Sequence, residues 1–170
     1  MRSANGWTLL PHPKFLVQVA KLKVRVASAR TADPTGYERG PDAKLLRAIL
    51  TLIYEVIPTD PCAKPFRQGD TLGKGRKHWF RAKFGNGRYR LFFQFNSAAK
   101  IIIYAWVNDA ESLRTYGSKT DAYVVFRSML AGGNPPDAWE DLTKAVGARV
   151  KPGTVPNVGP KRKKGDGRKR

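Results

Sequence analysis

Cationic side chains gather in one short stretch of this 170-residue sequence. Residues 64–90 hold nine Lys and Arg residues and a single acidic one, Asp70. Alternation along a strand would place Arg81 and Lys83 on one face, with Arg90 opposite Lys83 on the next strand. Like charges that face each other on a sheet destabilise it by a few tenths to about 1 kcal/mol. The pattern therefore indicates a site for an anion such as phosphate, and a solvated face with splayed side chains is the alternative.

Other candidate constellations each lack a component. The segment Gly69–Gly75 resembles a nucleotide-phosphate loop, but it is one residue short and has no Ser or Thr to hold magnesium. His12 and His78 are the only histidines, and no local pattern brings them together as an acid and base pair. Cys62 is the single cysteine, so an intrachain disulfide is excluded and a reducing, cytoplasmic location is expected. No metal-ligand spacing is present, and we expect no metal and no cofactor.

The overall charge points to a polyanionic partner. The chain has 32 Lys and Arg residues against 13 Asp and Glu, a formal net charge of +19. Hydrophobic residues make up 41% of the sequence, which is enough to form a core and argues against a disordered polycation. The longest apolar runs, such as Ile101–Val107, are far shorter than the ~20 residues that cross a bilayer, so no membrane partner is expected.

Hydrophobic periodicity predicts an α+β fold, with two N-terminal helices packed on a small antiparallel sheet and further helices on the C-terminal side. Proline at the first turn and glycine after the last turn mark several of the helix ends. The predicted helices cover residues 14–29, 41–58, 120–130 and 135–146, and the predicted strands cover 7–10, 80–84, 88–95 and 101–107.

The dipeptide Asn86-Gly87 predicts a tight hairpin, because a type I′ turn requires positive φ at both central residues. Lys83 then faces Arg90 across the ladder. If the third strand pairs Phe95 with Ile101, Trp106 lies opposite Arg90, and Tyr104 shares its face. The two aromatic rings could stack on RNA bases there, or pack beneath a helix.

The composition changes after Gly147. Residues 148–170 contain prolines, glycines and two runs of Lys and Arg, with no aromatic residue. We predict one domain over residues 1–147 and a disordered basic tail over 148–170.

Several motifs resemble the YhaV family of bacterial toxins, which belong to type II toxin-antitoxin modules and to the RelE-like group of messenger-RNA interferases. The resemblance covers roughly residues 5–145. The motifs that carry it are Asn5-Gly6-Trp7, His12-Pro13-x-Phe15, Pro65-Phe66-Arg67, Lys83–Phe93, Trp106-x-Asn108-Asp109, Leu113–Tyr123 and Pro135-Pro136-x-x-Trp139.

The resemblance implies a RelE-like fold and an endoribonuclease that cleaves messenger RNA on the ribosome without a metal, inhibiting translation and growth. It also implies a co-encoded antitoxin of the PrlF type that forms a hetero-oligomer with the toxin. The family's catalytic positions fall on Arg81, Lys83, Arg90, Arg114 and Tyr116. The side chains expected to bind RNA are Arg67, Lys74, Arg76, Lys77, Arg88, Tyr104, Trp106 and Lys119.

The expected reaction is attack by the RNA 2′-hydroxyl on the adjacent phosphate, which leaves a cyclic phosphate and a 5′-hydroxyl. Crowding by Arg81 and Arg90 favours the neutral form of Lys83 and makes it a candidate proton acceptor. Tyr116 is a candidate proton donor. Charge and aromatic residues alone would suit a non-catalytic RNA-binding or ribosome-associated protein equally well. A DNA-binding regulator is a third possibility, although no recognition helix stands out.

Overall fold

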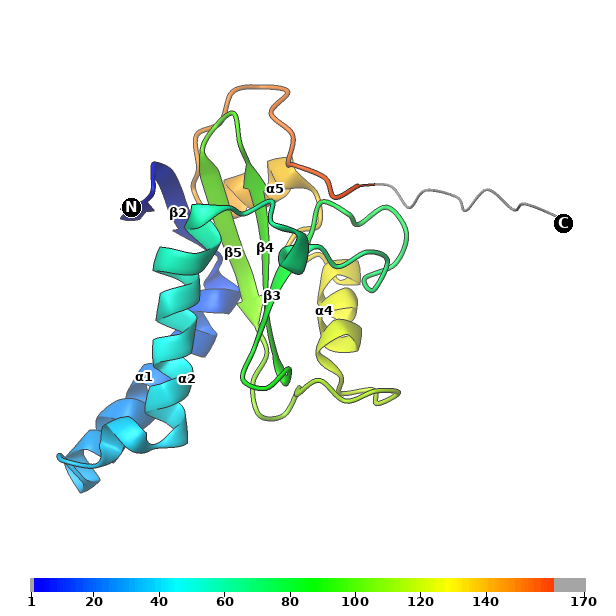
Figure 1. Cartoon of the computed structure of the whole chain (residues 1–170). Coiled ribbons are helices and arrows are strands. Elements are labelled where there is room, and N and C mark those ends of the chain that lie inside the picture. Colours follow the sequence, from blue (N-terminus) through cyan, green and yellow to red (C-terminus); the bar gives the residue numbers. More distant parts are fainter. Residues whose placement is uncertain (1, 161–170) are drawn as a thin grey trace, which may run out of the picture.

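The computed structural model describes residues 2–160 and contains one five-stranded sheet between two layers of helices (Figure 1). The strand order is β1-β2-β5-β4-β3. The strands are β1 (Arg2–Ala4), β2 (Trp7–Pro11), β3 (Phe80–Phe84), β4 (Tyr89–Asn96) and β5 (Ile101–Val107). The predicted α+β class is confirmed. One pair, β2 with β5, is parallel, which corrects the expectation of a purely antiparallel sheet.

Strand β1 was not predicted, although its turn carries the same signal as the central hairpin. Asn5 and Gly6 connect β1 to β2 and have φ angles of 48° and 77°. Asn and Gly tolerate this left-handed conformation better than other residues. An Asn-Gly pair thus marks the turns of the β1–β2 and β3–β4 hairpins.

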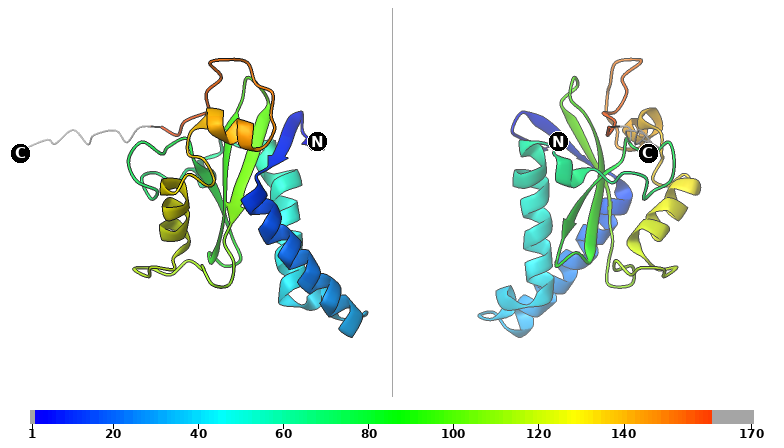
Figure 2. Two further views of the ribbon diagram at one scale, coloured as in Figure 1. Left: turned by 180° about the vertical axis from the view of Figure 1, so that it is seen from behind. Right: turned by 45° about the vertical axis from the view of Figure 1, so that its right-hand side comes forward.

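The helices divide between the two faces of the sheet (Figure 2). On one face, α1 (Pro13–Ala32) and α2 (Pro41–Thr51) run together and project past the end of the sheet, joined by the 3₁₀ turn η1 (Tyr37–Arg39). Helix α2 continues through a π-helical turn η2 (Leu52–Val56) into α3 (Ile57–Thr59). The buried side chains of this layer pack with those of β3 and β4 around Phe93 and Phe95.

On the other face, α4 (Ala122–Ala131) and α5 (Trp139–Ala145) pack around Phe92 and Ile103.

The register of the central hairpin is confirmed. Lys83 pairs with Arg90, and Asn86 and Gly87 both have positive φ. The next pairing differs from the prediction in two places. Phe95 pairs with Ile102 and not with Ile101, and a further one-residue shift between Phe92 and Phe93 leaves Ala105 as the extra residue of a bulge. Trp106 therefore lies opposite Phe92 and not Arg90. A bulge reverses which face the following side chains occupy, so Trp106 joins the α4 layer.

Residues 148–160 are not the disordered tail that the composition predicted. The backbone N–H of Asn157 donates to the carbonyl of Phe95 at 2.8 Å, and the Asn157 side chain accepts from Ser97 N–H at 2.8 Å. Farther along, Gly159 N–H donates to the Lys77 carbonyl at 2.8 Å. This C-terminal segment (residues 148–160) is thus attached to the end of the β4–β5 hairpin and to the loop before β3. The rest of the predicted tail, residues 161–170, lies outside the described residues.

Candidate functional site

Two buried arginines from adjacent strands converge on one phenol oxygen. Arg81 on β3 and Arg90 on β4 are 7% and 6% exposed and point toward α4. Their Nε atoms donate to the Tyr123 hydroxyl at 2.7 and 3.1 Å. The remaining contacts are backbone carbonyls, since Arg81 donates to Pro65 at 2.6 Å and Arg90 to Gly87 at 2.7 Å. Within residues 2–160, no carboxylate forms an ion pair with either arginine. Burying such cations without a counter-ion is costly, so the pair is poised to bind an anion.

The N-terminus of α4 adds a third arginine to this cluster. Asp121 caps the helix by accepting from Tyr123 N–H at 3.0 Å, and it also accepts from Thr115 N–H at 2.7 Å. The same carboxylate pairs with Arg114. The Arg114 guanidinium carbon lies 5.0 Å from the centre of the Tyr123 ring and 4.4 Å from that of Tyr116. We call Arg81, Arg90, Arg114 and Tyr123 the arginine cluster.

The environment of Tyr123 changes its acidity. Burial raises the pKa of the phenol, but the positive charge of Arg81 and the hydrogen bonds from Arg81 and Arg90 lower it. The lowering effects outweigh burial, so the pKa lies below the ordinary value of about 10. The phenol therefore gives up its proton more readily than a free tyrosine. Tyr123 lies within the Leu113–Tyr123 motif but was not predicted as a site residue, because only the packing of α4 places it against the two strands.

Two other predicted catalytic residues lie at the rim of the cluster. Lys83 is exposed, and its ammonium makes no hydrogen bond or ion pair with any residue in the described part of the chain. Tyr116 is 92% exposed, and Arg114 packs over its ring. The structure thus brings all five predicted catalytic residues to one side of the hairpin, two of them buried and two exposed.

Asn108 is a positioning residue that the sequence did not single out for this role. Its side-chain oxygen accepts from Arg90 N–H at 2.6 Å, and its amide group donates to the carbonyls of Arg88 and Ser112 at 3.0 and 2.8 Å. These bonds tie the loop after β5 to the hairpin. Arg114 N–H donates to the Arg88 carbonyl at 2.9 Å, so the same strand end also anchors Arg114.

The predicted base-stacking role of Tyr104 and Trp106 is contradicted by their burial. Tyr104 is 2% exposed on the face that α1 and α2 cover, and its hydroxyl donates to the Ile53 carbonyl at 2.7 Å. Trp106 is 4% exposed and stacks on Phe126 with ring centres 5.8 Å apart. Neither ring offers a free surface to a base, and packing beneath helices, the alternative interpretation, holds for both.

The basic side chains predicted to bind RNA lie in three places. Arg67 and Lys74 are exposed in the loop between η3 (Lys64–Phe66) and β3, while Lys77 in that loop is partly covered. Arg88 is exposed in the hairpin turn, and Lys119 is exposed in the loop before α4. Arg76 differs, because its Nε atom pairs with Asp137 at 3.0 Å and is committed to the fold.

The two histidines have separate structural roles. The Nδ1 atom of His12 accepts from Lys14 N–H at 3.1 Å and caps α1. His78 bonds to Asp137 at 2.8 Å, and the same carboxylate oxygen accepts from Trp79 at 2.7 Å. These contacts leave no His12–His78 pair for acid and base catalysis.

Residues 2–160 contain neither a cluster of metal-binding side chains nor a membrane-spanning helix. That range holds no group of three or more His, Cys, Asp and Glu side chains that could bind a metal ion. No helix within it has both the length and the apolar character needed to cross a membrane.

The chain is similar in sequence to a known family of bacterial toxins. A sequence profile for the YhaV toxins, described as toxins with endonuclease activity from a toxin-antitoxin system, matches residues 9–147. The ribonuclease toxin YhaV of Escherichia coli K12 is 47% identical over 141 residues, which is 82% of this chain and 92% of that protein. Toxin YhaV of Escherichia coli O157:H7 matches with the same identity and coverage.

A solved structure of an arginine-to-alanine mutant of the E. coli toxin RelE, in the free state, is 15% identical and covers 72% of this chain and 97% of its own length, with a TM-score of 0.39. Family membership rests on the profile and on the sequence identity, both of which span the arginine cluster. The chain belongs to the YhaV family of toxins, which have endonuclease activity and act within toxin-antitoxin systems.

Proposed function

We propose that this toxin is a messenger-RNA interferase that cleaves RNA through the arginine cluster, without a metal, and thereby stops translation and growth. The observation that carries the proposal is the convergence of two buried arginines, with no counter-ion in the described chain, on a tyrosine whose pKa they lower. A phosphate group of RNA would supply the negative charge that these arginines lack. The exposed Lys83 at the rim would extend the same anion site toward the substrate.

The reaction we propose is an internal displacement. The 2′-hydroxyl gives its proton to a base, its oxygen forms a bond to phosphorus, and the bond to the 5′-oxygen breaks as that oxygen takes up a proton. Arg81 and Arg90 would stabilise the charge that builds on the phosphoryl oxygens, where one well-placed donor contributes about 10²–10³-fold in rate. Tyr123 is better supported as the base than Lys83, because two arginines donate to its oxygen and favour the phenolate. Lys83 then becomes the candidate donor to the leaving oxygen, in place of Tyr116, which was the candidate donor from the sequence.

Substitution of Arg81 tests the site in the cell. Induction of the natural chain should arrest bacterial growth and shorten messenger RNAs, whereas Arg81→Ala should do neither, because the phosphate loses a buried donor. Lys23→Gln removes one positive charge from an exposed position on α1 and should stay as toxic as the natural chain. Circular dichroism establishes that both variants are folded. Equal toxicity of folded Arg81→Ala would remove Arg81 from the site.

The nucleophile and the metal requirement are tested with purified protein. Cleavage should continue in excess EDTA and leave a 2′,3′-cyclic phosphate, since the 2′-hydroxyl is the nucleophile. An RNA with a single 2′-deoxy nucleotide at the scissile position should resist cleavage. Loss of activity on chelation, or cleavage of the deoxy substrate, would contradict the mechanism.

We also propose that the toxin acts on ribosome-bound messenger RNA in the cytoplasm, and that an antitoxin of the PrlF type neutralises it in a hetero-oligomer. Membership of the family supports an antitoxin partner in general. The net charge of +19 favours association with a polyanion such as RNA. Cleavage of one messenger RNA should be faster with translating ribosomes than without them. An equal rate in both reactions would leave RNA cleavage in place and exclude the ribosome requirement.

A further inference from the structure

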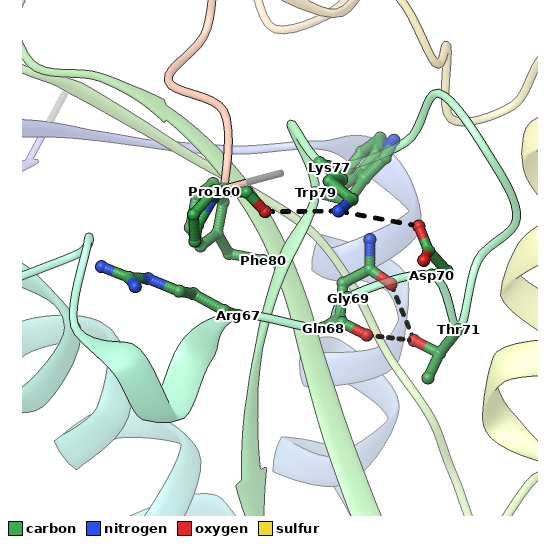
Figure 3. Close-up of a pocket in the computed structure, with 10 residues that line it drawn as sticks. Arg67, Gln68, Gly69, Asp70, Thr71, Lys77, Trp79, Phe80 and Pro160 are labelled. Carbon is green, nitrogen blue, oxygen red and sulfur yellow. Dashed lines mark hydrogen bonds and ion pairs between the residues drawn. The ribbon is translucent and has the colours of Figure 1, made fainter. Parts of the chain in front are cut away.

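A cavity of about 570 Å³ lies between the loop that precedes β3 and the C-terminal segment. Figure 3 shows Arg67 and Gln68 on one side of this cavity and Lys77 with Pro160 on the other. Trp79 and Phe80 lie behind its lining but are only 1% and 0% exposed, so the apolar surface that a ligand can reach comes from the exposed Pro160. Its volume is sufficient for one nucleotide base.

The cavity adjoins the arginine cluster along the chain and across the sheet edge. Arg67, on the rim, forms an isolated antiparallel bridge with Phe80, and Phe80 directly precedes Arg81 in β3. Arg81 also donates to the Pro65 carbonyl, two residues before Arg67. A strand of RNA whose phosphate occupies the arginine cluster therefore has this cavity as a neighbouring site.

Charges are arranged around the cavity in a way that suits a nucleotide. Arg67 is exposed at one rim. At the other rim, the Lys77 ammonium lies 3.2 Å from the Pro160 carbonyl and 3.9 Å from Asp70, the only acidic residue of this stretch (Figure 3). Two cations can bind phosphates, while an exposed carboxylate can accept hydrogen bonds from the N–H groups of a base.

One wall of the cavity is built by residues outside the family match. Gly159 and Pro160 line it, whereas the match ends at residue 147. The Gly159 N–H bond to Lys77 holds this wall in place.

We infer that this cavity is a binding subsite for one unpaired nucleotide of the RNA that flanks the scissile phosphate, and that the C-terminal segment completes it. Arg67 and Lys77 bind the phosphates of this nucleotide, its base packs against the exposed Pro160, and Asp70 accepts from the base. The inference rests on the proposed function, because it assumes that RNA is the substrate of the arginine cluster.

The test measures affinity as a function of RNA length. Uncleavable RNAs, each with a 2′-deoxy nucleotide at the mapped cleavage position, are lengthened one nucleotide at a time on either side. With the natural chain, one added nucleotide should raise affinity about tenfold, and an abasic nucleotide at that position should not. The increase should fall below about twofold in the double variant Arg67→Gln, Lys77→Gln.

Two controls distinguish binding in the cavity from a general effect of positive charge on RNA affinity. The double variant Lys23→Gln, Arg39→Gln removes two exposed charges from the projecting helical layer and should keep the increase. Replacing residues 161–170 by an uncharged Gly and Ser segment of equal length should keep it as well, because Gly159 and Pro160 remain. Circular dichroism shows that each variant is folded.

The different ways in which this test can fail are distinguishable. An increase that is the same in the cavity variant and in the control variants would overturn the subsite. The subsite would also be overturned if RNA affinity rose by the same factor for every added nucleotide, even if the enzyme cleaves RNA normally. If the natural chain neither binds nor cleaves any RNA, the proposed function itself fails and the subsite fails with it.

Discussion

At the scale of single residues, the site depends on how buried arginines are held without carboxylates. Backbone carbonyls and the Tyr123 hydroxyl satisfy the N–H groups of Arg81 and Arg90 but leave their charge unbalanced. Lysine could not replace either one, because an ammonium lacks the planar fork that reaches several acceptors at once. Arg114 differs from these two, since Asp121 balances its charge and orients it over the Tyr123 ring. In the proposed mechanism, the first two arginines therefore stabilise charge and Arg114 shapes the site.

Tyr123→Phe tests the proposed base. The ring and its packing remain, but the oxygen that accepts from both arginines is lost, and single-turnover cleavage at neutral pH should fall about 10²–10⁴-fold. A base must be deprotonated to act, so the rate for the natural chain should rise with pH and level off at the lowered pKa of Tyr123, below about 10. The variant should show no such rise. Parallel pH profiles for the two proteins would reduce Tyr123 to a positioning residue.

At the scale of elements, the junction of β2 and α1 links the sheet to the helical layer. The parallel pairing of β2 with β5 ends at Pro11 and Tyr104, and His12 N–H then donates to the Tyr104 carbonyl at 2.9 Å. The His12 side chain is 2% exposed and caps the helix through a neutral ring nitrogen that accepts from Lys14 N–H. A protonated ring could not accept this bond and would place a positive charge at a helix N-terminus.

This capping contact should make stability depend on pH. Burial, and then the charge of Lys14, lower the pKa of His12 below 6.5, so the unfolded chain binds a proton more readily than the folded one. The stabilisation is complete above about pH 6.5 and is lost as the pH falls through the lowered folded-state pKa. His12→Asn keeps an acceptor that does not titrate and should remove this component, while His12→Ala should cost about 1 kcal/mol at pH 7.5.

Urea unfolding of the three proteins at pH 7.5 and pH 5 measures the effect on the free energy of unfolding. The difference between the natural chain and His12→Asn should shift in favour of the variant at the lower pH. A difference that stays constant between the two pH values would show that His12 contributes no pH dependence.

At the scale of the whole molecule, exposed cations lie on three loops around the central hairpin. The loop before β3, the hairpin turn and the loop before α4 all carry exposed cations, among them Lys74, Arg88 and Lys119. Residues 161–170 add seven Lys and Arg residues against one acidic residue, Asp166. The described chain leads to this basic sequence from Pro160, beside the cavity.

The basic sequence should contribute affinity but no chemistry. Replacing residues 161–170 by an uncharged segment of equal length should flatten the dependence of log affinity on log salt by about 0.7 for each RNA phosphate that the natural segment neutralises. Single-turnover cleavage at saturating RNA should stay nearly unchanged, because the arginine cluster is intact. An unchanged salt slope would show that this charge is merely solvated, and a collapse of the saturated rate would place the segment in the active site.

Features that depend on neighbouring residues could be predicted from the sequence. Asn86-Gly87 sets the hairpin register, because turn chemistry acts over four residues, and this places Lys83 opposite Arg90. Helical periodicity and proline positions located the two N-terminal helices to within a few residues. The motifs from Lys83 to Phe93 and from Leu113 to Tyr123 indicated the family, which the sequence profile and the identity to YhaV confirm, and predicted Arg90 and Arg114 as site residues.

The tertiary structure alone decided what depends on packing between distant segments. The bulge at Ala105 places Trp106 beneath α4. The bulge is stabilised by side chains that pack on both faces of the sheet. No pattern of neighbouring residues specifies those contacts. The site has Tyr123 as its centre because α4 packs across β3 and β4, 33 to 42 residues away in sequence. The attachment of Asn157 and Gly159 likewise depends on backbone bonds to distant loops. Backbone N–H and C=O groups are the same in every residue type, so composition does not show where they will pair. Composition therefore predicted a disordered tail for residues 148–160, although long-range hydrogen bonds hold this segment against the cavity.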